Sequence, residues 1–108
     1  MSVNDNFFGI RKGLLEFIVL LIIAAEKVYA ADILKQLSQT EFATQEGTLY
    51  PLLSKMRREG LLDYEWQESE AGPPRKYYEL TKEGKEYLAD LDESWNDLVE
   101  SVNLIRTR

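Results

Sequence analysis

Apolar residues recur with helical spacing in three stretches before residue 60. Residues 10–25, 29–38 and 44–59 each carry one apolar face, and the length of the first favours a helix over a strand despite its β-branched content. Thr44 is expected to cap the third helix. The expected core positions are Leu14, Leu15, Ile18, Leu21, Ile22 and Ala25, then Ala30, Ile33, Leu34 and Leu37, then Leu49, Leu52, Leu53 and Met56.

Two strand-like runs follow the third helix. Gly60 can take the left-handed conformation that ends a helix. Residues 61–69 and 74–81 are then expected to pair antiparallel around a turn at residues 70–74. Pro51 removes one hydrogen bond inside the third helix, so we expect a bent start with a regular helix from about Leu49. Three helices and a hairpin predict a mainly helical α+β fold, a winged helix-turn-helix with a two-stranded wing.

The last segment, residues 82–108, has the pattern of a helical seam, with Thr81 as its expected cap. Its apolar residues are spaced alternately by three and four positions, which is the a/d pattern of a helix that packs along another helix. The partner is either a second copy of the chain or the chain's own first helix, and we favour the second copy. The seam residues are Leu88, Leu91, Trp95, Leu98, Val102 and Ile105.

Composition removes several classes of function. The 108 residues form one small domain and include no cysteine and no histidine, so disulfides, the usual metal ligands and the usual general base are lacking. Neither an enzyme nor a bound metal or cofactor is expected. The apolar run at residues 17–25 is too short to span a bilayer, and Glu16, Glu26 and Lys27 flank it. It predicts a buried helix, no membrane partner and a cytoplasmic location.

The net charge of −6 is unevenly distributed. Residues 82–100 hold seven acids and two bases, whereas the third helix ends in a basic stretch. Charges on a distant helix are screened beyond about 8 to 10 Å, so they leave a local basic surface effective. The wing nevertheless holds Glu65, Glu68 and Glu70.

The order of motifs resembles the PadR family of transcriptional regulators over nearly the whole chain. The matching pieces are GLLE at residues 13–16, EGTLYPLL at 46–53, REGL at 58–61, RKYY at 75–78, LTKEG at 80–84, and Trp95. The resemblance implies a winged helix-turn-helix in residues 1–81, a C-terminal dimerisation helix in residues 82–108, and a repressor that releases operator DNA on binding a small effector. One departure is Ala31, which stands where the family carries an aromatic residue similar to one that contacts the DNA backbone.

The resemblance assigns a DNA-contacting face to the third helix and the wing. Gln45 and Thr48, at the helix start, are expected at base edges or nearby phosphates. Residues expected to position the phosphate backbone are Tyr50, Ser54, Lys55 and Arg58 on the helix, with Arg75, Lys76 and Tyr77 on the wing. For each basic residue taken alone, a solvated surface charge is the alternative.

Trp95 has two interpretations. By resemblance to short members of the family, it is one wall of a pore that stacks a planar aromatic effector; otherwise it fills the dimer interface, as tryptophan at a seam usually does. The other residues expected at such an effector site are Leu91, Leu98, Val99, Phe7 and Phe8.

The sequence therefore predicts a regulator that binds double-stranded DNA as a homodimer, with a pseudo-palindromic operator. The alternative is an acidic winged-helix module that assembles with proteins and makes no specific DNA contact. The acidic wing and the pI near 4.7 favour that alternative.

Overall fold

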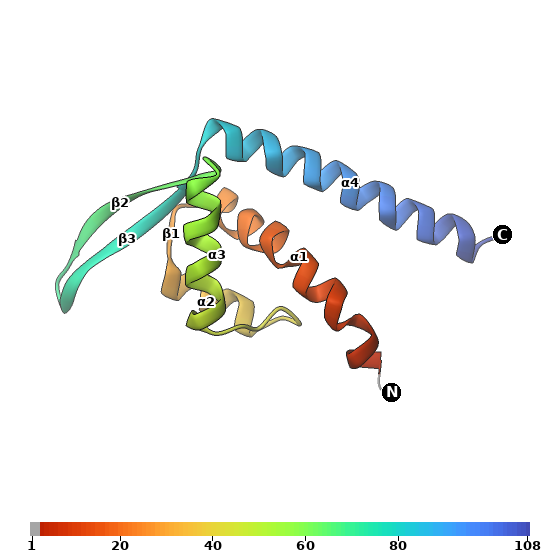
Figure 1. Cartoon of the computed structure of the whole chain (residues 1–108), viewed down its shortest axis with the longest axis horizontal. Coiled ribbons are helices and arrows are strands. Elements are labelled where there is room, and N and C mark those ends of the chain that lie inside the picture. Colours follow the sequence, from red (N-terminus) through yellow and green to blue (C-terminus); the bar gives the residue numbers. More distant parts are fainter. Residues whose placement is uncertain (1–2) are drawn as a thin grey trace.

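A computed structural model describes residues 3–108, without the side chains of residues 3–6 and 8. Four helices and a three-stranded antiparallel sheet make a winged helix-turn-helix, which confirms the predicted fold class (Figure 1). The elements are α1 (Val3–Ala25), β1 (Val28–Tyr29), α2 (Ala30–Ser38), α3 (Glu46–Arg58), β2 (Leu62–Ser69), β3 (Gly72–Leu80) and α4 (Lys82–Arg106). None of the described helices is long and apolar enough to cross a membrane.

The core lies where α1, α2 and α3 meet the base of the sheet. The predicted apolar faces of α2 and α3 are confirmed, with Ile33, Leu37, Leu49, Leu53 and Met56 fully buried. α1 departs only in part from its predicted face, of which Leu14, Leu15, Ile18 and Ile22 are half-buried against the core. Its buried residues are Phe17, Val19, Leu20 and Ile23, whereas Leu21 and Ala25 are exposed. Because this helix is apolar on most of its circumference, the pattern could not single out the side that the other helices cover.

The predicted helix ends are confirmed in part. Gly60 has φ +80° and closes α3 as expected. The Oγ1 of Thr81 accepts a hydrogen bond from the Gly84 N–H at 2.9 Å, which confirms this cap. Two other expectations are wrong: α1 begins at Val3, well before residue 10, and the cap of α3 is Gln45, not Thr44.

The start of α3 is more regular than Pro51 suggested. The Leu49 N–H donates to the Gln45 carbonyl at 3.0 Å, so the helical hydrogen bonds begin in the first turn. The regular helix thus starts at Glu46, earlier than predicted. The Gln45 side chain makes no capping hydrogen bond.

The sheet has a third strand that the sequence pattern missed. β1 pairs antiparallel with β3 through Val28 opposite Tyr78 and Tyr29 opposite Tyr77, giving the order β1-β3-β2. Tyr29 therefore caps α2 from extended backbone and is not its first helical residue. The hairpin turn is also tighter than predicted, because residues 72–74 already belong to β3. Pro73 and Pro74 lie where the register between β2 and β3 shifts, and such an irregularity tolerates their missing N–H groups.

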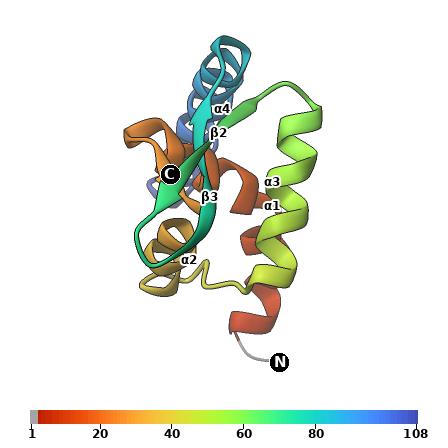
Figure 2. The ribbon, with the colours of Figure 1, turned by 90° about the vertical axis from the view of Figure 1, so that its left-hand side faces the viewer.

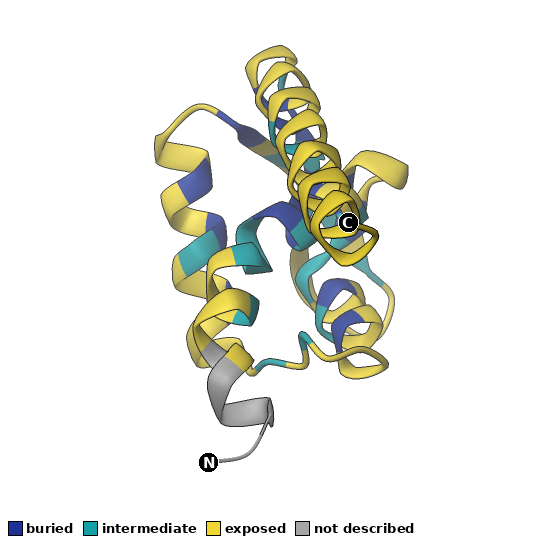
Figure 3. Ribbon diagram, turned by 90° about the vertical axis from the view of Figure 1, so that its right-hand side faces the viewer, coloured by how far each residue is buried: buried dark blue, intermediate teal, exposed yellow. Residues whose placement is uncertain are grey.

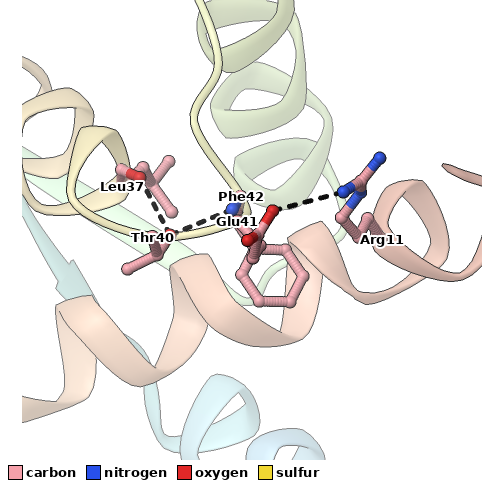
Figure 4. Close-up of polar contacts among 5 residues, drawn as sticks. All are labelled: Arg11, Leu37, Thr40, Glu41 and Phe42. Carbon is pink, nitrogen blue, oxygen red and sulfur yellow. Dashed lines mark hydrogen bonds and ion pairs between the residues drawn. The ribbon is translucent and has the colours of Figure 1, made fainter. Parts of the chain in front are cut away.

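The loop between α2 and α3 is held to α2 and to α1 (Figure 4). The Thr40 hydroxyl donates to the Leu37 carbonyl at 2.8 Å and accepts from the Phe42 N–H at 3.0 Å. Glu41 pairs with Arg11 on α1 at 3.3 Å. These contacts set where α3 begins relative to α1.

The two halves of α4 have different environments. In the first half, Leu88 is buried and Leu91 half-buried, and the Trp95 ring lies 6.3 Å from the Phe17 ring on α1. The second half projects past the other helices and is exposed on all sides (Figures 1 and 3). Leu98, Val102 and Ile105 are 61%, 50% and 59% exposed. The chain's own first helix thus covers only the beginning of the predicted seam.

Candidate nucleic-acid interface

A groove of about 490 Å³ lies between α3, the start of α2 and the hairpin. Figure 2 looks onto this side of the molecule, with α3 beside the hairpin and α2 below it. The residues that line the groove are Tyr29, Ala30, Ala31, Tyr50, Ser54, Trp66, Arg75, Lys76 and Tyr78. They include two cations, three tyrosines and a tryptophan, and no carboxylate is among these described lining residues. The groove can therefore accept an anionic, partly apolar partner such as a sugar-phosphate backbone.

Strand alternation separates the wing's charges. Lys76 lies opposite Trp66, and Tyr78 opposite Tyr64, so these four side chains share the face toward α3. Glu65, opposite Tyr77, lies on the other face and accepts a hydrogen bond from Gln67 at 3.3 Å. Glu65 is thus directed away from the groove.

A row of alternating cations and aromatic rings runs from α3 along this face. The Arg57 guanidinium lies 4.6 Å from the centre of the Tyr64 ring, and the Lys76 ammonium lies 4.6 Å from the same ring and 5.5 Å from Trp66. Cation–π contacts hold a positive charge without neutralising it. We call Arg57, Tyr64, Lys76 and Trp66 the cation–aromatic row.

Tyr78 lies in the floor of the groove. Burial raises the pKa of its hydroxyl, and the nearby Tyr64 and Tyr50 raise it further, whereas Arg57 lowers it. The hydroxyl therefore stays protonated near neutral pH and adds no negative charge to the groove.

The predicted DNA face of α3 is divided between two sides of the helix. Tyr50 and Ser54 line the groove described above, whereas Thr48 lines a second groove of about 540 Å³ that also includes Arg11 and Lys12 of α1. Lys55 is turned toward α1, where its ammonium lies 3.7 Å from the Glu16 carboxylate and 4.0 Å from that of Glu59.

Gln45 and Arg58 are exposed at opposite ends of α3. The structure therefore does not gather all predicted α3 residues into one pocket. It places them around the outer half of a single helix, which a groove-entering helix requires.

The wing residues also divide. Arg75 lines the first groove and its guanidinium lies 5.6 Å from the Tyr29 ring. Tyr77 packs against Tyr29 at 5.0 Å but lines a separate groove that includes Glu26 and Asp32.

Comparison with known proteins decides the family. The sequence profile of the transcriptional regulator PadR-like family matches residues 19–90. This chain belongs to the PadR-like family. The match spans α3, the wing and the first part of α4.

Solved PadR-like structures share the fold. A PadR-like transcription factor from Bacteroides fragilis is 46% identical, with 94% of this chain and 98% of that chain covered and a TM-score of 0.79. A PadR-like transcriptional regulator from Bacillus cereus is 38% identical, covering 87% and 92%, with a TM-score of 0.79. A PadR family regulator from Eggerthella lenta is 31% identical, covering 95% and 90%, with a TM-score of 0.84.

The sequence pattern did not predict several residues of the groove and the cation–aromatic row in this PadR-like chain. Trp66 and Tyr29 line the groove and Arg57 joins the cation–aromatic row, yet none was selected. Alternation along β2 could have placed Trp66 beside Lys76. The position of Tyr29 depends on its pairing with β3, almost fifty residues later, which no local pattern reveals. Ala31 also lines the groove.

A smaller cavity of about 170 Å³ lies beside Trp95, between α1 and α4. Leu91, Trp95 and Leu98 line it, and Phe17 and Tyr87 add aromatic walls. Val99 and Phe7 are exposed and are not among its lining residues. The side chain of Phe8 lies outside the described residues.

Proposed function

We propose that this PadR-like chain binds a pseudo-palindromic operator as a homodimer and represses transcription. The observation that carries the proposal is the groove beside α3, which combines cations, hydroxyls and aromatic rings without a lining carboxylate. In this assignment Gln45 and Thr48 contact base edges. Tyr50, Ser54 and Arg58 contact phosphates along α3, and Lys55 joins them after leaving Glu16.

The C-terminal half of α4 supports the homodimer. Its seam residues are at least half exposed from Leu98 onward, and such a continuous apolar stripe is costly in water. We assign residues 82–108 to dimerisation and residues 1–81 to DNA binding. A two-fold axis through paired α4 helices would present two α3 helices to successive major grooves, about 34 Å apart.

Salt dependence tests the DNA assignment directly. Each lysine that neutralises a phosphate contributes roughly 0.9 to the slope of log affinity against log salt. Lys76→Ala is therefore expected to weaken binding equally on all duplexes and to lower the slope by about one. Gln45→Ala should instead relax discrimination at one base pair. A wild-type slope indistinguishable from zero between about 50 and 200 mM salt would refute phosphate contact.

We extend the proposal to release by a planar aromatic effector at Trp95. The cavity between α1 and α4 supports this extension. A ring stacked there would alter the packing of α4 on α1, and hence the spacing of the two α3 helices in the dimer. Trp95 emission should then change with planar aromatic cations or phenolic acids in the Trp66→Phe variant, where Trp95 is the remaining tryptophan. Unchanged emission across the panel would leave Trp95 as interface core.

The alternative is a protein-assembly module, favoured by the net charge of −6. The same salt titration separates the two functions. An assembly module would show no salt-dependent affinity for duplex DNA, whereas the proposed regulator would lose affinity steeply as salt rises.

A further inference from the structure

Trp66 is the most exposed of the large aromatic side chains that the structure describes, at 62%. It lies on β2, on the face toward α3, and not at the hairpin turn. Burying an indole removes roughly 150 to 250 Å² from water. Because most of this side chain is left exposed, the fold loses a large part of that stabilisation. A β-strand position that alternates with half-buried Tyr64 would accept a polar residue without cost to the fold.

The neighbours of Trp66 indicate what would cover it. The Lys76 ammonium lies 5.5 Å from the indole, and Tyr50, Ser54 and Arg75 line the same groove. An apolar plane beside an unneutralised cation matches a deoxyribose with its adjoining phosphate, since the sugar offers C–H groups to the ring and the phosphate offers its charge to the lysine. A protein partner would have to place a carboxylate at Lys76 and an apolar side chain on the indole, because it lacks the repeating sugar-phosphate unit.

We propose that Trp66 contacts the DNA backbone, packing its indole against a deoxyribose while Lys76 binds the adjoining phosphate. This proposal rests on the proposed function and adds a residue to it. The indole contact is apolar and independent of base identity. It therefore contributes affinity on every sequence and adds nothing to the salt dependence.

The chain's two tryptophans allow a direct test. In the Trp95→Phe variant all tryptophan emission comes from Trp66. A mixed-sequence duplex of about 30 base pairs, long enough for two half-sites one turn apart, should change this emission and protect it from acrylamide quenching. The Trp66→Phe variant, which reports Trp95 alone, is the matched control and should show much less protection by the same DNA.

Affinity separates contact from positioning. Trp66→Ala should weaken binding roughly tenfold from the lost apolar contact while the salt slope stays that of the wild type. If the indole only positioned Lys76, the slope would fall by about one, as in Lys76→Ala. Asn96→Ala, at an exposed position of α4 outside the seam, is the control and should bind like the wild type. Thermal melting of each variant checks folding.

The possible outcomes separate failure of the Trp66 contact from failure of the proposed function. If the wild type fails to bind the duplex, the proposed function fails. If the wild type and the Trp95→Phe variant both bind the duplex, but Trp66 emission is unprotected or Trp66→Ala binds like Asn96→Ala, the contact is refuted while DNA binding stands. A lowered salt slope in Trp66→Ala, or protection by single-stranded DNA alone, also overturns the contact.

Discussion

Gly84 occupies the place where α4 passes closest to the end of α3. It is buried in the first turn of α4, and a Cβ built there would meet the carbonyl oxygen of Leu61. The same Leu61 carbonyl accepts a hydrogen bond from the Thr81 N–H at 3.1 Å, so the backbone there cannot withdraw without losing it. The glycine in the LTKEG motif is thus required by packing.

Gly84→Ala is accordingly expected to destabilise the fold by roughly 1 to 3 kcal/mol, as overpacking does, despite the better helix propensity of alanine. Gly47→Ala is the matched control, since its Cβ would meet open space. That change should stabilise α3 by about 0.5 to 1 kcal/mol. Chemical denaturation of both variants gives the comparison, and a Gly84→Ala protein as stable as wild type would contradict the close approach.

At the scale of elements, the helices that begin at Gln45 and Thr81 are capped differently. Thr81 receives the Gly84 N–H and its own hydroxyl donates to the Gly60 carbonyl at 2.6 Å. Gln45 leaves the first N–H groups of α3 without a side-chain acceptor. Glutamine is a weak capping residue compared with serine, and its side chain remains free to reach outward from the helix start.

Gln45→Ser should therefore raise stability by about 0.5 to 2 kcal/mol while it lowers discrimination between DNA sequences. Thr81→Ala, which removes an existing cap, should lower stability by about 1 kcal/mol. Thermal unfolding measures the first effect, and binding to matched and scrambled sites measures the second. Unchanged discrimination in Gln45→Ser would remove this residue from base readout.

The sequence pattern predicted some helices and helix ends correctly and missed other elements. The one-sided patterns of α2 and α3 predicted their buried faces, and the glycine and threonine at positions 60 and 81 predicted two helix ends. The partial error in the face of α1 has a physical cause, since nearly every side of that helix is apolar. β1 is two residues long, so its existence depends on pairing with a distant strand. For the same reason the groove, which three elements build together, was predicted only in Tyr50, Ser54, Arg75 and Lys76.

Across the whole molecule, which measures 57 × 34 × 21 Å, the wing and the end of α4 project in opposite directions (Figure 1). The first half of α4 packs on α1, and the second half extends beyond it. Leu98 and Leu104 in that second half are similarly exposed, at 61% and 69%, but only Leu98 belongs to the seam. Comparing them separates a specific interface from general surface hydrophobicity.

Leu98→Asp should convert the proposed dimer to a monomer at micromolar concentration, because it places a charge within an apolar interface. Leu104→Asp introduces the same charge outside the seam and should leave the dimer intact. Sedimentation equilibrium measures both. A wild type that is monomeric with and without duplex DNA would refute the homodimer.

The manner in which the cations are held bears on the order of events during association. Arg57 and Lys76 rest on rings, so an arriving phosphate displaces no counter-charge from them, whereas Lys55 first has to give up Glu16. In the proposed complex, the hairpin side would therefore bind a strand at the first encounter, and the side of α3 beside α1 would bind only after its ion pair opens. First contact with the DNA and formation of the final complex would then be separate kinetic steps, which involve opposite sides of α3.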